Sequence, residues 1–138
     1  MYADVENVTP SKLYSICTHI WESEELIEKI MTFANWSDPL LVVSWNECPL
    51  VIIGIVPDAI LSGSGYIWAQ ETPTITKYSF VVARSAVEIL RAAKLRYPNL
   101  RTHAATKAAE HGWKLAGGVC LHRVANTTFC TFGDQHAR

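Results

Sequence analysis

The sequence predicts an α/β (α+β) fold, with a mixed, twisted sheet flanked by helices, in a single domain spanning residues 1–138. Two apolar runs, at 39–45 and 49–56, are rich in β-branched residues and are typical of central strands. Further along, the chain reads as a strand, a long helix and a second strand, at 65–71, about 77–97 and 99–105. Because such a crossover joins parallel neighbours, the sheet should contain parallel as well as antiparallel pairs.

Two helices are predicted before the first apolar run. Residues 1–8 carry little periodicity and fit either a loosely held segment or an edge strand. Thr9 offers a capping hydroxyl before Pro10, which is favoured at the first helical position. An apolar stripe follows, formed by Leu13, Ile16, Cys17 and Ile20. Ser23 starts a second helix with an acidic first turn, as the helix dipole favours. Its core side is formed by Leu26, Ile27, Ile30 and Met31.

The two apolar runs predict a hairpin at the centre of the sheet. They are joined by residues 46–48, a length that suits a hairpin. Neither run alternates between apolar and polar residues, so each should be covered on both faces. After Val56 the chain should leave the sheet and return through a loop at 59–65 to the strand at 65–71.

The long helix should bury one apolar side and expose a charged one. Its predicted core side is formed by Phe80, Ala83, Val87 and Leu90. Arg84, Glu88 and Arg91 are placed on the opposite side. Pro98 ends the helix, because the residue before a proline avoids helical geometry. A last helix at 107–116 follows, with Thr106 as its cap and Gly117-Gly118 as its end.

The remaining strands form a second predicted hairpin, at 119–124 and 127–132, with a turn at 125–126 and a polar tail at 133–138. No repeat, low-complexity run or linker indicates a second domain. Cys120 and His122 share a strand face without a third partner, which favours a core pair over a catalytic one.

Composition excludes several classes of protein. A net charge of −1 and a pI near 6.5 argue against a basic nucleic-acid binder, whereas the near-zero charge and a positive mean hydropathy favour association, including with a second copy. The four cysteines stand apart with no CxxC pattern, so they predict free thiols in a reducing compartment and no zinc site. No signal peptide or membrane segment is evident, and secretion is not expected.

The end of the chain resembles a known family. The pattern Thr106-x-x-Ala109-x-x-x-Trp113-x-x-x-Gly117 is similar to the last helix of GNAT-type N-acetyltransferases, which usually reads Asn-x-x-Ala-x-x-x-Tyr-x-x-x-Gly-Phe. The order of the elements at 65–118 is also that of the second half of this family. The resemblance implies a GNAT-like fold and, for an active member, acetyl-CoA as the cofactor.

A sharper likeness is to the small GNAT-like internal virion proteins of short-tailed bacteriophages, over roughly residues 38–132. The motifs that carry it are Pro49-Leu50, Tyr66-Ile67-Trp68, a basic helix from Arg84 to Tyr97-Pro98, and Gly117-Gly118-Val119. This resemblance implies a structural or assembly protein of a phage particle. Its partners would be other virion or assembly proteins, in the virion interior or the host cytoplasm.

The residues that an acetyltransferase needs are largely missing. The family cradles the coenzyme pyrophosphate on glycine-rich backbone, whereas residues 71–78 contain no glycine, and Pro73 removes one amide donor. Threonine hydroxyls at 72, 74 and 76 with Lys77 could still hold an anion. The family's tyrosine acid aligns with Trp113, whose indole cannot deliver a proton to a thiolate. Glu71 is the candidate base, and His103 and His111 do not have metal-site spacing.

The predicted function is therefore that of a catalytically degenerate GNAT-like phage protein acting by association. No catalytic, cofactor-binding or metal-binding residues are assigned, and no cofactor is expected. The candidate interface is the basic side of the long helix, with Arg84, Arg91, Lys94 and Arg96. The alternatives are an acetyl-CoA-dependent N-acetyltransferase with a divergent loop at 72–77, and a small module that binds a host protein through the same helix.

Overall fold

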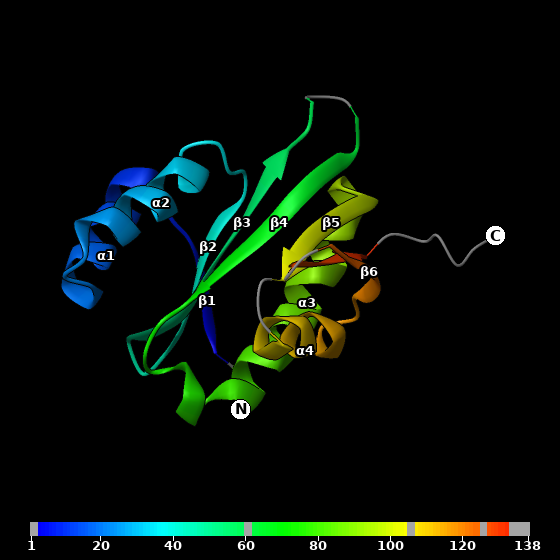
Figure 1. The fold of residues 1–138 in the computed structure, drawn as a ribbon. Coiled ribbons are helices and arrows are strands. Elements are labelled where there is room, and N and C mark those ends of the chain that lie inside the picture. Colours follow the sequence, from blue (N-terminus) through cyan, green and yellow to red (C-terminus); the bar gives the residue numbers. More distant parts are fainter. Residues whose placement is uncertain (1–2, 60–61, 105–106, 125–126, 133–138) are drawn as a thin grey trace. The chain divides into compact units, whose positions relative to one another are not determined.

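The structure, a computed structural model, describes residues 3–59, 62–104, 107–124 and 127–132 (Figure 1). Within them, seven strands form one mixed sheet with the hydrogen-bonded order β1-β2-β3-β4-β5-β7-β6. The α/β fold predicted from the sequence, a mixed sheet with flanking helices, is confirmed. The chain divides into two compact units, Met1–Val56 with Ala69–Val82, and Pro57–Trp68 with Ala83–Arg138.

The first unit contains the N-terminal helices and the antiparallel strands. Its elements are β1 (Asp4–Asn7), α1 (Pro10–Ile20), α2 (Glu24–Ala34), β2 (Leu40–Trp45), β3 (Cys48–Pro57) and the short 3-10 helix η1 (Ile75–Lys77). The segment before α1 is an edge strand, because β1 pairs antiparallel with β2. The helices α1 and α2 lie together over one face of these strands (Figure 1).

Both predicted helix caps are present in the first unit. The Thr9 hydroxyl accepts a hydrogen bond from the Lys12 amide at 3.2 Å, and the Ser23 hydroxyl accepts one from the Leu26 amide at 3.2 Å. These caps satisfy amides that have no partner inside the helix.

The strands β2 and β3 form the predicted central hairpin. Its turn is shorter than residues 46–48, because Trp45 already pairs with Cys48 and only two residues remain. These two residues, Asn46 and Glu47, have φ values of 50° and 64°, the left-handed geometry whose twist matches a two-residue hairpin. The apolar runs are covered on both faces, as predicted. Buried side chains include Leu40, Val42, Val43, Leu50, Ile52 and Ile55.

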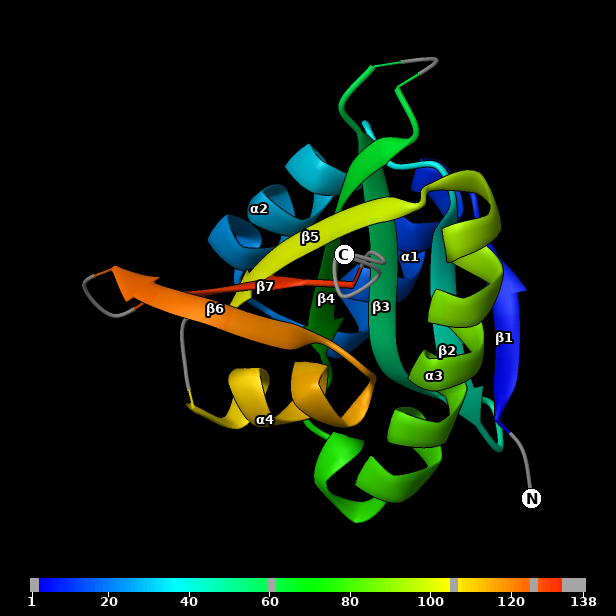
Figure 2. The same cartoon turned by 90° about the vertical axis from the view of Figure 1, so that its right-hand side faces the viewer.

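The second unit contains the crossover and the C-terminal hairpin (Figure 2). Its elements are the first part of β4 (Ser64–Glu71), most of α3 (Ser79–Arg96), β5 (Asn99–Ala104), α4 (Lys107–Leu115), β6 (Val119–Val124) and β7 (Thr127–Thr131). The predicted parallel pairing is present, with Ser64 opposite Asn99 and Tyr66 opposite Arg101. The hairpin strand β7 pairs antiparallel with both β5 and β6.

The end of α4 explains the two glycines that follow it. Gly117 has a φ of 104°, which glycine adopts without strain. Its amide donates to the Lys114 carbonyl at 3.0 Å, and the Gly118 amide donates to the Trp113 carbonyl at 2.8 Å. This pair of bonds is a Schellman motif and confirms the predicted end of the helix. The predicted cap at Thr106, the turn at 125–126 and the tail at 133–138 lie outside the described residues.

One predicted core residue of the long helix is wrong. Phe80 is 79% exposed, although it was assigned to the core side. It precedes Arg84 by one helical turn, and residues four apart share a side of a helix, so the two cannot lie on opposite sides. The prediction for Leu90 is confirmed, because its side chain is buried, and Ser85 is a further buried residue of α3. The α-helix also begins at Ser79, two residues later than the periodicity suggested.

Candidate functional site

The connection between β4 and α3, residues 72–78, folds as a tight turn that uses its own amides. The bonds run from the Thr72 amide to the Leu50 carbonyl at 3.0 Å, from Ile75 to Thr72 at 3.1 Å, from Lys77 to Thr74 at 3.3 Å, and from Tyr78 to Ile75 at 2.9 Å. Pro73 has no amide hydrogen. Four amides of this connection are therefore committed to carbonyls of the chain, where a phosphate cradle would need them free.

Two of the three threonines proposed to hold an anion fix this connection to β3. Thr72 is 3% exposed, and its hydroxyl donates to the Pro49 carbonyl at 2.8 Å. The Thr74 hydroxyl lies 3.6 Å from the Cys48 thiol, which donates to it. Thr76 and Lys77 are the exposed members of the set. The Lys77 ammonium, at the end of a flexible side chain, can still bind an anion. The backbone amides that would surround a pyrophosphate in a phosphate cradle are not available to help it.

An aromatic contact lies at the end of the same turn. The rings of Tyr78 and Trp45 are 6.3 Å apart at an angle of 36°. Trp45 is the last residue of β2, so this pair joins the turn to the β2–β3 hairpin. Aromatic pairs at this distance add to the free energy gained from burial, so this contact stabilises the packing of the turn on the hairpin.

The two residues considered for acid–base catalysis have ordinary structural surroundings. Glu71 is exposed at the end of β4, and its backbone carbonyl accepts a bond from the Gln70 side chain at 3.1 Å. The Trp113 ring contacts the Phe132 ring edge-on, with centroids 5.5 Å apart. Trp113 therefore packs on the end of the C-terminal hairpin.

A polar and aromatic cluster on one face of the second unit was missed by sequence reasoning. The Tyr66 hydroxyl lies 2.7 Å from Nδ1 of His103, and the two rings are 5.3 Å apart. The His103 ring is in turn 6.3 Å from that of Phe129. Burial raises the pKa of Tyr66, so its phenol stays protonated at neutral pH. The signal was the alternation of β5, which places residues 101 and 103 on one exposed face.

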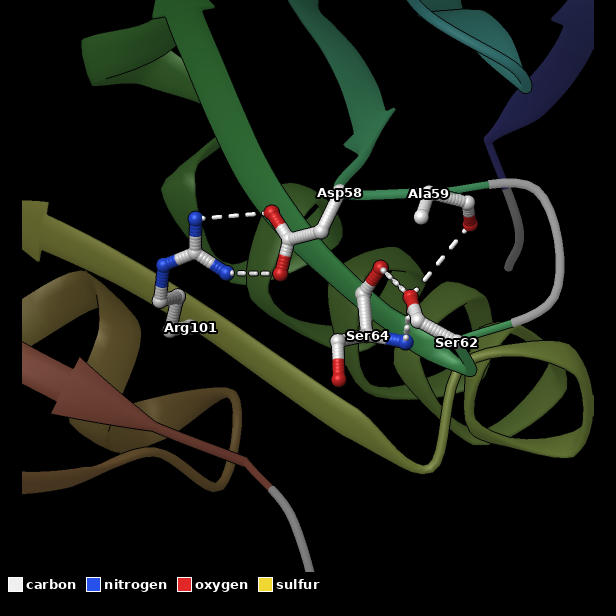
Figure 3. A network of polar contacts seen from close by, with 5 residues as sticks. All are labelled: Asp58, Ala59, Ser62, Ser64 and Arg101. Carbon is white, nitrogen blue, oxygen red and sulfur yellow. Dashed lines mark hydrogen bonds and ion pairs between the residues drawn. The ribbon is translucent and has the colours of Figure 1, made fainter.

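Arg101 extends this cluster to the loop between β3 and β4 (Figure 3). Its guanidinium forms two hydrogen bonds with the Asp58 carboxylate, at 2.6 and 2.8 Å. These bonds hold the pKa of Asp58 below its ordinary value of 3.8. The loop is also closed from within, because the Ser62 hydroxyl donates to the Ala59 carbonyl at 3.3 Å and accepts from the Ser64 amide at 3.2 Å.

The four residues predicted as an interface all lie on α3, but only part of the set shares a side. Arg84 and Arg91 are exposed and two turns apart, so they point the same way. Lys94 is half-buried, and the Arg96 guanidinium lies 5.1 Å from the centre of the Tyr97 ring. The exposed side also includes Leu95, which is 89% exposed.

Other predicted sites can be placed as well. In the described part of the chain, no group of three histidine, cysteine or acidic side chains could hold a metal ion. No helix among the described residues is long and apolar enough to cross a membrane. His111 is exposed on α4, and the side chain of His122 lies outside what the structure describes.

Comparison of the chain with protein-family models and with curated proteins finds no match. Solved structures do match. A chimera of the Vibrio cholerae spermidine N-acetyltransferase SpeG and hSSAT has a TM-score of 0.69 at 10% identity, covering 99% of this chain and 98% of that one. AAC(6')-Ib in complex with paromomycin and acetyl-CoA has a TM-score of 0.71 at 8% identity, covering 98% and 95%.

A third similar structure is the Campylobacter jejuni N-acetyltransferase PseH, with a TM-score of 0.63 at 11% identity, covering 98% of this chain and all of that one. Identities this low show the fold alone. The order of elements predicted from the closing pattern of the sequence is therefore confirmed at the level of fold: the chain has the fold of GNAT acetyltransferases.

Proposed function

We propose that this chain is a GNAT-fold protein that acts by protein association and has lost the coenzyme cradle. The observation that carries the proposal is the turn at 72–78, whose backbone amides are already hydrogen-bonded to carbonyls of the chain. In a phosphate cradle, several amides converge on the anion and the backbone approaches it closely, which glycine permits. Here the amides of Thr72, Ile75, Lys77 and Tyr78 already have carbonyl partners.

Opening the turn would be costly. A ligand would have to break these bonds, and it would also have to release the buried hydroxyl of Thr72 from the Pro49 carbonyl. A buried polar group left without a partner costs about 1–3 kcal/mol. Binding of the pyrophosphate would therefore be weakened by orders of magnitude, since about 1.4 kcal/mol corresponds to a factor of ten.

The partner class follows from the motifs of the sequence. Their resemblance to internal virion proteins of short-tailed phages makes proteins of a phage particle the first partners to test. The exposed side of α3 supports an electrostatic contact with an acidic surface, because Arg84 and Arg91 lie on one side of it. A host protein with an acidic surface would dock in the same way.

The second candidate is an acetyl-CoA-dependent N-acetyltransferase. The observation that favours it is the near-complete coverage of acetyltransferase structures, one of them solved with acetyl-CoA. In that reading, Lys77 and Thr76 would supply the contact to phosphate, and Glu71 the base. The proton to the leaving thiolate would have to come from a group other than Trp113.

Calorimetric titration with acetyl-CoA separates the two candidates. If the cradle has been lost, no saturable heat is expected below millimolar acetyl-CoA. Saturable heat at tens of micromolar, lost in Lys77→Ala and kept in Lys12→Ala, would establish the acetyltransferase reading. Lys12 is a matched control because it is an exposed lysine in the same unit, paired with Glu6. Heat that both variants retain would place a coenzyme site elsewhere and would also contradict the account.

A further inference from the structure

Two of the four cysteines face each other across the C-terminal hairpin, whose strands β6 and β7 are drawn in Figure 2. Cys120 on β6 and Cys130 on β7 are directly opposed, and their Sγ atoms lie 2.8 Å apart. Opposed residues on antiparallel strands have Cα atoms about 4.5–5.5 Å apart. This separation falls within the range of about 4.4–6.8 Å that disulfides span. The two sulfurs can therefore reach bonding distance without movement of the backbone.

The surroundings give the two thiols different roles. Cys130 is buried, and burial is the main cause that raises its pKa to about 12, so it stays protonated until its partner has reacted. Cys120 is partly exposed and is the thiol that a reagent from solvent can reach. On the neighbouring helix α4, the Lys114 ammonium lies 3.0 Å from the Glu110 carboxylate, which also accepts a bond from Thr128 at 2.8 Å.

We propose that Cys120 and Cys130 are a modification site, which low-molecular-weight disulfides oxidise reversibly to a cross-strand disulfide. The thiolate of Cys120 attacks one sulfur of the reagent, forming a mixed disulfide and releasing one small thiolate. Cys130 then loses its proton and attacks the Cys120 sulfur, releasing the second small thiolate. The protein loses two protons and two electrons, and the reagent takes up both electrons. The proximity of the sulfurs offsets the small thiolate fraction of Cys130.

The other two cysteines lack this arrangement and serve as internal controls. Cys17 is buried in α1, and burial raises its pKa to about 11. The Cys48 thiol donates to the Thr74 hydroxyl. The structure has all four cysteines as free thiols, so it describes the proposed site in its reduced form.

The disulfide would link the edge strand β6 covalently to its neighbour β7. β6 ends the strand order, and in the described residues β7 is the strand that pairs with it. A bond between Cys120 and Cys130 would add a covalent link to this pair, so the amides of β6 should exchange more slowly in the oxidised protein. Treatment with dithiothreitol should restore the exchange rates.

The test uses the full chain, folded, with oxidised glutathione as the probe. After acid quenching, unfolding and alkylation, peptide mapping should find one disulfide, between Cys120 and Cys130, with Cys17 and Cys48 alkylated. Dithiothreitol should return all four thiols. Four alkylated thiols after prolonged treatment, or a disulfide that includes Cys17 or Cys48, would overturn the proposal.

Two variants assign the roles. Cys130→Ser should accumulate a glutathione adduct on Cys120, because nothing can resolve the mixed disulfide, whereas Cys48→Ser should form the cross-link at the wild-type rate. An adduct on Cys120 that is no more abundant in Cys130→Ser than in wild type would overturn the proposed order of steps. Circular dichroism shows whether each variant is folded. The peptide mapping of the wild-type protein tests the proposal even if a variant does not fold.

Discussion

At Gly118 the chain has no room for a β-carbon. A Cβ built there would lie 2.7 Å from Cε1 of Phe132 and 2.9 Å from the Trp113 carbonyl oxygen. Gly118→Ala should therefore lower the free energy of unfolding by about 1–3 kcal/mol, the usual cost of overpacking. Urea denaturation followed by circular dichroism measures this change.

Gly112 provides the matched control for this substitution. It lies in the same helix as Trp113, and a Cβ there would meet nothing within 4 Å. Gly112→Ala should raise the stability by about 0.5–1 kcal/mol, because alanine loses less backbone entropy in a helix. Equal effects of the two substitutions would show that the contact with Phe132 does not limit the size of residue 118.

The Asp58–Arg101 pair predicts a defined dependence of stability on pH. The pKa of Asp58 lies below 3.8 in the folded chain, so the carboxylate contributes stability above its unfolded value and loses it as pH falls through the folded one. Both side chains are partly exposed, at 35% for Asp58 and 52% for Arg101, which limits the contribution to about 1 kcal/mol.

Asp58→Asn should therefore lower the melting temperature at pH 7, and the difference from wild type should shrink as pH falls below 3.8 and vanish once pH is below the pKa of Asp58 in the folded chain. Asp4→Asn, which removes an exposed carboxylate in the other unit, is the control. A difference for Asp58→Asn that stays constant down to acid pH would mean that the pair contributes through packing and not through charge.

Among single residues, caps and turn formers could be predicted, but pairs distant in sequence could not. Thr9 and Ser23 act on amides three residues away, so the local sequence contains the whole interaction. The contact of Tyr66 with His103 joins residues 37 positions apart and depends on the register of β4 and β5. No single-sequence pattern fixes that register.

Among the elements, α3 carries the predicted interface and can be tested as a unit. Arg84→Glu with Arg91→Glu should leave the stability within about 1 kcal/mol, because exposed charges contribute little to folding. Co-purification with virion proteins should drop, and its salt dependence should flatten, because the steering charge has reversed.

The matched control is Lys29→Glu with Lys107→Glu, which changes the net charge equally at exposed positions of α2 and α4. Loss of co-purification in both double variants would indicate an effect of net charge, and retention in both would exclude this side of α3 as the interface. The outcome that supports the account is loss in the α3 variant alone.

The elements themselves followed from the sequence where periodicity and end signals agree. The parallel crossover, both hairpins and the end of α4 at Gly117 are examples. The attachment of the connection at 72–78 to β3 could not be predicted, because the bonds of Thr72 depend on where β3 presents the carbonyls of Pro49 and Leu50. The exposure of Phe80 was missed because apolar residues on a helix were assumed to mark one buried side.

At the scale of the whole molecule, the fold and the proposed loss of coenzyme binding depend on different parts of the sequence. The order of helices and strands gives the arrangement shared with SpeG, AAC(6')-Ib and PseH at identities of 8–11%. In the proposed function, the loss of coenzyme binding rests on a single connection, at which this chain has threonines and a proline. The missing glycines were visible in the sequence, whereas the use of the amides by the turn itself required the structure.

Amide NMR of the isotopically labelled chain, titrated with acetyl-CoA, tests the closed turn most directly. The amide resonances of Thr72, Ile75, Lys77 and Tyr78 report whether these amides exchange their carbonyl partners for phosphate oxygens. We expect these resonances to keep their positions at all acetyl-CoA concentrations below about 1 mM, which is near the upper end of the range of specific coenzyme affinities. Saturable shifts centred on these residues would contradict this expectation, because they would show that the turn opens into a coenzyme cradle.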